Sequence, residues 1–233
     1  MAQNTSVIRT GAAAEDSISA LTQAGDVVGA LAGLGLAGIA GWLPSRRPTW
    51  LALAGASLTV LAGVFWIFRN PERSITGEEG IVVAPCDGEV TGVAPVQEPD
   101  FLRAPAYCIT LRVRPGDVQV LRAPVAGVVR HRRYVPAGQS GGQRDVLWLG
   151  LRQPAGSGVL LKMGVSALWR AMPSCVGRRI TVLIDLEDTV RSGQICGHLP
   201  LGGEVQVYTT AAAQLAVQAG ARVRAGETIL ASF

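Results

Sequence analysis

The residues of greatest chemical interest lie at a turn near the C-terminus, in residues 197–208. Pro200 interrupts the chain there, the pair Gly202 and Gly203 follows, and apolar and polar residues alternate over 205–208. This pattern predicts a turn that leads into a half-buried strand. The glycine pair presents bare backbone without side chains. His198 is within reach of the turn, although a polar residue flanking a loop is the simpler interpretation. Taken alone, the stretch predicts a hairpin turn.

Short strands must position this turn. Gly, Pro and Asp separate a series of strand-like segments in the second part of the chain, which is typical of a mostly β fold. The segments are 81–83, 109–113, 118–121, 146–149, 159–162, 180–184 and 205–208. Only residues 165–170 indicate a short helix.

The same region contains a loose internal repeat. Residues 84–90 parallel 123–129, and residues 187–193 parallel 220–226. Such paired hairpins occur in lipoyl- and biotin-type sandwich folds, so we expect a compact β domain with sandwich-hybrid hairpins. A carrier domain of that type would need a modifiable lysine at a hairpin tip. The only lysine, Lys162, lies in an apolar run instead, which disfavours a carrier function.

The N-terminal part differs in composition. Residues 27–43 and 50–68 are two uncharged, apolar runs, and Arg46 and Arg47 lie in the loop between them. Runs of this length predict an α-helical hairpin that crosses a membrane and returns, with Trp50 and Trp66 as interfacial anchors. We therefore expect an N-terminal tail at 1–24, a membrane-anchoring helical hairpin at 25–70 and a β domain at 71–233.

Charge and residue usage exclude several classes of function. The net charge of +4 comes almost wholly from arginine, which suits an anionic lipid surface. Aromatic residues are few and do not interleave with arginine, so we expect no nucleic-acid partner. Two histidines and no His/Cys/Glu cluster predict no metal site. The four cysteines lack CxxC spacing, so we expect free thiols rather than a disulfide framework.

Several motifs, in order, resemble the phosphatidylserine decarboxylase family of the short bacterial and archaeal type. Residues 68–73 resemble the family's Phe-Arg-Asp-Pro-x-Arg entry, and residues 83–90 its Ser-Pro-Ala-Asp-Gly-Lys-Val motif. Residues 114–127 resemble its Asp-Val-His-Val-Asn-Arg-Ala-Pro motif, and residues 134–138 a Tyr-x-Pro-Gly continuation. The turn at 202–208 corresponds to the family's Gly-Ser followed by a Val-Asp-Val-Tyr strand. Each motif is weak alone, but their order and spacing together are specific.

The resemblance implies a particular chemistry. In this family the chain cuts itself between Gly and Ser, and the Ser becomes a self-generated pyruvoyl group, so no external cofactor is expected. That group forms a Schiff base with the substrate amine and takes up the electrons released as CO2 leaves. A His and an Asp near the site move and orient protons. Phosphatidylserine is thereby converted to phosphatidylethanolamine.

This chain departs from the family at two matching positions. Asp87 and Asp117 are present, Gly202 matches the family's Gly, but Gly203 replaces the Ser and Gln119 replaces the His. Glycine has no hydroxyl to start the acyl shift, and glutamine does not exchange protons near neutral pH. Asp87 also suits a simple turn residue, an interpretation with equal weight.

We therefore expect a member of phospholipid metabolism that neither cuts itself nor decarboxylates: a pseudoenzyme that retains lipid or partner binding. Two alternatives stay open. One is an active phosphatidylserine decarboxylase that uses an unrecognised residue, and the other is a structural membrane adaptor. Restoring Ser at 203 is expected to permit slow cleavage, and restoring His at 119 to accelerate it.

The expected partners are membrane phospholipids with acidic or aminophospholipid headgroups. A basic set on the β domain suits such headgroups; it comprises His131, Arg132, Arg133, Arg112, Arg114, Arg178 and Arg179. We expect the protein at the cell inner membrane with the β domain on the cytoplasmic side. Either a homo-oligomer or a hetero-oligomer is compatible with the sequence.

Overall fold

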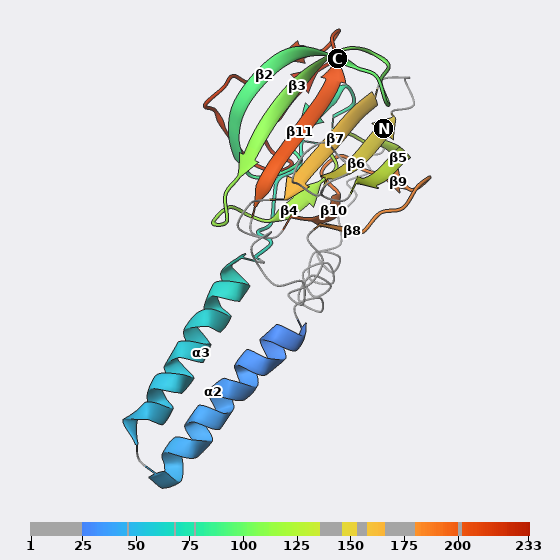
Figure 1. Cartoon of the computed structure of the whole chain (residues 1–233). Helices are drawn as coiled ribbons and strands as arrows, with labels where there is room; N and C mark the ends of the chain where they lie inside the picture. The colour runs from blue at the N-terminus through green and yellow to red at the C-terminus, as the bar shows by residue number, and fades with distance from the viewer. Residues whose placement is uncertain are drawn as a thin grey trace, which may run out of the picture. The chain divides into compact units, whose positions relative to one another are not determined.

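The computed structural model describes residues 25–45, 47–67, 69–76, 78–135, 146–152, 158–165, 180–199 and 202–233. Within the chain, residues 1–72 and 73–233 form two separate compact units. The first contains the helices and the second contains the strands (Figure 1). The expected helix at 165–170 lies outside the described residues, except for Val165, which ends a strand.

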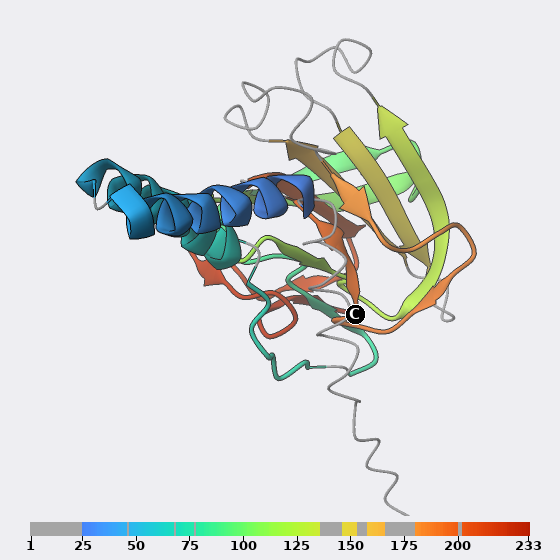
Figure 2. The same ribbon diagram turned by 90° about the horizontal axis from the view of Figure 1, so that it is seen from below.

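Two helices form the described part of the first unit. Helix α2 spans Gly25–Ser45 and helix α3 spans Pro48–Ile67, and they lie side by side in both views (Figures 1 and 2). Glycines on α2 allow the close approach. A Cβ added at Gly38 would lie 2.9 Å from the Trp50 carbonyl oxygen, and one at Gly41 would lie 2.7 Å from the Trp50 ring. The two predicted helices are therefore present and packed through small residues.

The prediction that these helices cross a membrane is wrong. Within the described residues, neither helix combines the length and the apolarity that a bilayer crossing requires. The physical reason is that an uncharged residue is not always a strongly apolar one. Gly and Ala recur along both helices, with Ser and Thr in α3, and these small side chains gain little free energy on leaving water.

The second unit is built from antiparallel strands in three sheets. The large sheet has the order β13-β2-β3-β11-β7-β6-β5-β9, and two small sheets have the orders β1-β14-β12 and β4-β10-β8. The large sheet comprises β13 (Arg222–Val223), β2 (Gly88–Glu98), β3 (Ala104–Val113), β11 (Gly203–Thr210), β7 (Gly158–Val165), β6 (Val146–Arg152), β5 (Gly127–Val135) and β9 (Thr189–Val190). The small sheets comprise β1 (Ile81–Val83), β14 (Ile229–Ser232) and β12 (Gln214–Leu215), and β4 (Val120–Arg122), β10 (Ile195–His198) and β8 (Thr181–Val182). The mostly β prediction is confirmed.

The internal repeat is visible in the backbone hydrogen bonds. The N–H of Gly226 donates to the Ala84 carbonyl at 2.8 Å, and the N–H of Gly193 donates to the Ala123 carbonyl at the same distance. Likewise β13 pairs with the start of β2, and β9 pairs with the start of β5. In each half of the repeat, a short strand thus pairs with the start of a longer one, as the parallel motifs predicted.

Strand β11 is the centre of the large sheet and carries the turn of interest at its start. Val205 and Val207 are fully buried, while Glu204, Gln206 and Tyr208 alternate with them on the other face. β11 pairs with β3 on one side and with β7 on the other (Figure 1). Because both neighbours pair with β11 from Gly203 onward, the first residues of the strand are enclosed by backbone.

Candidate functional site

The turn that precedes β11 is held by the left-handed conformation of Gly202. Gly202 has φ +77°, is buried, and donates its N–H to the Leu199 carbonyl at 3.2 Å. The same N–H lies 2.7 Å from Oε1 of Gln119. Glycine is favoured here because other L-residues rarely adopt positive φ.

Neither glycine of the pair has space for a side chain. A Cβ at Gly202 would overlap the backbone carbonyl of Val113, and a Cβ at Gly203 would overlap the backbone carbonyl of Gly164. Val113 ends β3, and Gly164 lies near the end of β7, so the two sheet neighbours of β11 close in from both sides. The Cβ space at Gly203, the position that the resemblance aligns with the family's Ser, is therefore occupied by the backbone of β7.

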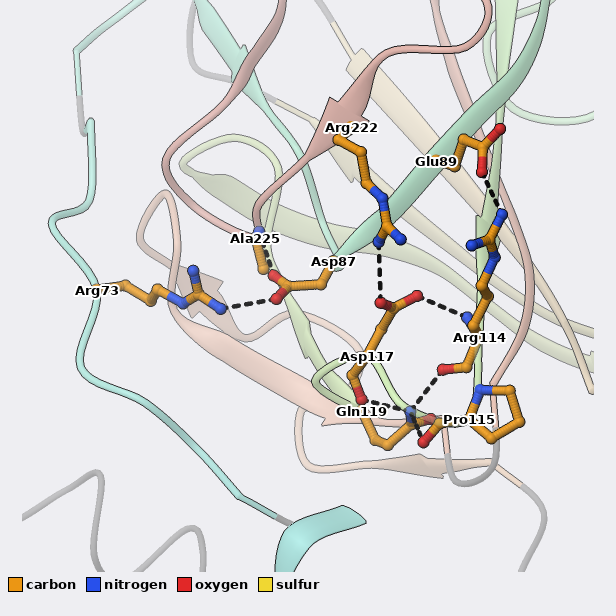
Figure 3. A network of polar contacts seen from close by, with 9 residues as sticks. All are labelled: Arg73, Asp87, Glu89, Arg114, Pro115, Asp117, Gln119, Arg222 and Ala225. Atoms are coloured by element: carbon orange, nitrogen blue, oxygen red, sulfur yellow. Dashed lines mark hydrogen bonds and ion pairs between the residues drawn. The ribbon is translucent and has the colours of Figure 1, made fainter.

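Gln119 connects this turn to a second one. The residue is 2% exposed, and its Nε2 lies 2.6 Å from the Asp117 carbonyl, 3.0 Å from that of Arg114 and 3.2 Å from that of Pro115 (Figure 3). Oε1 accepts the N–H of Gly202. The structure thus brings Gln119 and Gly202 together, as expected for residues of one site. In this arrangement both Nε2 and Oε1 of the carboxamide bind backbone groups, which is a structural use of the side chain.

Asp117 closes the turn over which Gln119 lies. Its Oδ2 accepts the backbone N–H of Arg114 at 2.8 Å, and its Oδ1 lies 3.2 Å from Nη1 of Arg222 (Figure 3). An aspartate that accepts a backbone N–H within its own turn is a common turn device. Its carboxylate also joins the repeat strand β13 to this turn.

Asp87 makes a different set of contacts. Its Oδ2 pairs with Arg73 at 2.7 Å, and its Oδ1 accepts the N–H of Ala225 at 2.8 Å (Figure 3). Arg73 also lies 3.6 Å from Glu227. The side chains of Arg73 and Asp87 are only 10% and 16% exposed. Among the described residues, Asp87 thus contacts Arg73 and Ala225 rather than the glycine turn. These contacts join Asp87 to other segments of the chain rather than to the backbone of its own turn.

His198 lies directly before this turn and is 6% exposed. Within the described part of the chain, its Nε2 is buried without a hydrogen-bond partner. Burial lowers the pKa of His198 below its usual 6.5. The imidazole is therefore neutral in the folded protein near pH 7. Sequence reasoning gave this residue little weight, because its burial depends on strands β4 and β8 on either side of β10.

The buried neutral His198 makes stability depend on pH. Below about pH 6.5 the unfolded chain takes up a proton that the folded chain resists, so the free energy of unfolding falls, by at most about 1.4 kcal/mol per pH unit. In His198→Gln this contribution is absent at every pH. Urea unfolding of the wild type and of His198→Gln at pH 7.5 and pH 5.5 measures this contribution. The effects of the other titrating groups are common to both proteins and cancel in the comparison. Equal losses of stability in both proteins would contradict the assignment.

Two members of the expected basic set, Arg132 and Arg114, are paired with acidic residues, as is the neighbouring Arg130. Arg130 forms an ion pair with Glu187, Arg132 forms one with Asp185, and Arg114 lies 2.6 Å from Glu89. Arg178 and Arg179 lie outside the described residues. The positive charge of this face is therefore smaller than the count of arginines suggested.

Lys162 also has structural partners. Its Nζ lies 3.6 Å from the carboxylate of Glu98, which is itself 1% exposed, and 4.6 Å from the centre of the Tyr208 ring. Glu98 in turn accepts the N–H groups of Phe101 and Leu102 at 2.8 Å. The lysine is thus part of the support for the β2–β3 connection.

The described cysteines are free and buried: Cys86, Cys108 and Cys196. Burial raises the pKa of Cys196 to about 12 and that of Cys86 well above its usual value, so both remain thiols at neutral pH. Cys175 lies outside the described residues. Among the residues that the structure describes, no three His, Cys, Asp or Glu side chains gather as a metal site would require.

These features do not fit a pyruvoyl group. The position that would supply it is Gly203, which has no hydroxyl and whose Cβ space the Gly164 carbonyl occupies. The position that the resemblance aligns with the family's proton-moving His holds Gln119, whose polar atoms all face backbone groups of two turns. Sequence reasoning identified both positions but missed Gly164 and Val113, because their carbonyls reach the turn only through the pairing of β11 with β7 and β3.

Comparison with known proteins identifies a family for this architecture. The family model described as phosphatidylserine decarboxylase matches residues 60–231. The phosphatidylserine decarboxylase proenzyme of Symbiobacterium thermophilum is 34% identical over 178 residues, which cover 76% of this chain and 80% of that protein. The proenzyme of Salinibacter ruber is 32% identical over 203 residues, covering 81% and 82%, and that of Desulfotalea psychrophila is 29% identical over 175 residues, covering 74% and 80%. No solved structure shows a significant match.

Proposed function

Since the chain belongs to the phosphatidylserine decarboxylase family, we propose that it is a member that neither cuts itself nor decarboxylates, and that it retains phospholipid binding. One observation carries this proposal. Gly203 lacks the hydroxyl that begins processing, and the backbone of β7 occupies the space where that hydroxyl would stand. The family belongs to phospholipid metabolism, and the proposed difference lies in the reaction alone.

The second replaced position supports the same proposal. A neutral histidine can accept a proton and release it, whereas the carboxamide of Gln119 cannot do so near pH 7. Its donors face three carbonyls and its oxygen faces the N–H of Gly202. A general acid or base would have to leave these contacts in order to reach a substrate, which would leave buried backbone groups unpaired.

The proposed ligand is a phospholipid with an acidic or amine-bearing headgroup. It follows from the substrate named for the related proenzymes, and the exposed residue Arg112, paired in register with Glu204 near the start of β11, provides a positive charge. We place the protein at the cytoplasmic face of the inner membrane, where such a lipid would be met. Part of the affinity is then electrostatic and decreases as salt rises.

The proposal predicts that the wild-type protein is one uncut chain. Intact mass spectrometry of the purified full-length protein is expected to give a single mass, and phosphatidylserine vesicles are expected to release no CO2 with it. Two chains, one ending at Gly202 and the other beginning at residue 203, would contradict the proposal. Release of CO2 would instead favour an active decarboxylase that uses another residue.

Vesicle flotation tests the retained lipid binding. The full-length protein is expected to float with phosphatidylserine vesicles more than with phosphatidylcholine vesicles, and the difference is expected to shrink when salt is raised from about 0.1 M to about 1 M. Equal flotation with both lipids at low salt would contradict headgroup binding and favour a structural adaptor.

A further inference from the structure

We infer that Gln119 is a positioning residue that holds the Gly202–Gly203 turn closed, so that the position of the lost histidine now has a structural role. The inference rests on the proposed function, because it explains what residue 119 does in a turn that is not cut. The contacts that carry it join parts of the chain far apart in sequence: Gln119 directly before β4 and Gly202 directly before β11.

The hydrogen-bonding capacity of a carboxamide matches this place. Nε2 offers two N–H donors to the three carbonyls of the 114–117 turn, and Oε1 accepts the N–H of Gly202 at 2.7 Å. Gln119 is 2% exposed as a residue, so water has little access to replace any of these bonds. Each buried group left without a partner would cost stability.

An imidazole cannot reproduce this pattern. A neutral histidine has one N–H donor and one acceptor nitrogen, and a protonated one has two donors and no acceptor. Donation to two carbonyls and acceptance from Gly202 at the same time therefore require an amide. Gln at position 119 in place of His thus supplies the hydrogen bonds that can hold the uncut turn in place.

The backbone of Gln119 holds the same segment from its other side. Its carbonyl accepts the N–H of Leu199 at 2.9 Å, and the Leu199 carbonyl accepts the N–H of Gly202 at 3.2 Å. The segment from Leu199 to Gly202 is therefore tied to residue 119 through both main chain and side chain. The side-chain bond alone links Gly202 directly to residue 119, so its loss is expected to loosen Gly202 more than the strands around it.

Amide hydrogen exchange followed by NMR on the full-length protein tests this inference. In the wild type, the Gly202 N–H is expected to exchange as slowly as the N–H of Val207 in the middle of β11. Exchange of Gly202 as fast as that of the exposed turn residue Ala212 would overturn the inference, and this measurement needs no variant.

Two variants separate the side-chain bond from general stability. Gln119→Met keeps the length and removes the polar atoms, and it is expected to speed exchange at Gly202 at least tenfold relative to Val207. The matched control is Gln194→Met, which removes an exposed amide that accepts the N–H of Arg191 at 2.9 Å and is expected to leave the Gly202 to Val207 ratio unchanged. An unchanged ratio in Gln119→Met would overturn the inference.

A conservative variant provides the rescue. In Gln119→Glu the ionised carboxylate has no donor for the three carbonyls, whereas the protonated acid has one donor and keeps an acceptor. Protection of Gly202 relative to Val207 is expected to be weak at pH 8 and to recover as pH falls below the pKa of the new carboxyl group. Lack of recovery would contradict the bonding assigned here. This result is separate from the proposed function, which fails only if the wild-type chain is cut or releases CO2.

Discussion

Gly203→Ser is expected to destabilise the β unit by about 3 kcal/mol or more and to leave the chain uncut, because the new Cβ must displace the Gly164 carbonyl. This changes the expectation from the motif alone, which was slow cleavage. A hydroxyl at this position would supply the missing nucleophile. The hydroxyl comes with a Cβ, however, and the space for that Cβ is filled by β7.

Gly203→Ala is the matched control for the Cβ, because it adds the same clash without a hydroxyl. Both variants are expected to lose similar stability in urea unfolding and to show one intact mass. A second control is Gly92→Ala in β2, where a Cβ meets nothing within 4 Å and the change is expected to stay within about 0.5 kcal/mol. If Gly203→Ser folds with wild-type stability and appears as two chains, only the hydroxyl was missing and the turn has room for it.

Asp87→Ala is expected to lower the free energy of unfolding by about 2–4 kcal/mol, as judged by urea unfolding at pH 7. The substitution removes the partner of the mostly buried Arg73 and the acceptor of the Ala225 N–H. Glu227, 3.6 Å from Arg73, compensates only part of the loss. Asp87→Asn keeps an acceptor for Ala225 and is expected to cost less than Asp87→Ala.

Asp185→Ala is the control for this pair. Asp185 pairs with Arg132 at the surface, and its side chain is 82% exposed, so its loss is expected to change stability by about 0–1 kcal/mol. Similar losses in Asp87→Ala and Asp185→Ala would show that Asp87 is not the structural residue that its contacts indicate.

Local patterns determined much of the fold. The alternation over 205–208 predicted a strand with Val205 and Val207 facing the core, and β11 has this arrangement. The repeat between 84–90 and 123–129 predicted matched hairpins, which the backbone hydrogen bonds show. Such patterns succeed because they report which face of a segment is buried, a property that neighbouring residues share.

Other elements escaped local patterns. Strand β2 was not among the predicted segments, since Gly92 and Pro95 interrupt its sequence. The strand continues past them because its register with β3 shifts between Val90 and Gly92 and pairing then resumes as far as Glu98. The absence of charge in the N-terminal runs predicted two helices correctly but led to the wrong expectation that they cross a membrane, because small uncharged residues are only weakly apolar.

At the candidate site, the sequence by itself determined which positions to compare, Asp87, Gln119, Gly202 and Gly203, and that residue 203 has no hydroxyl. Only the tertiary structure decided what those positions do. It places the Gly164 carbonyl in the Cβ space of Gly203, and it places the amide of Gln119 on the N–H of Gly202. Neither fact is encoded locally, because each depends on sheet pairing and turn packing between segments that are distant in the chain.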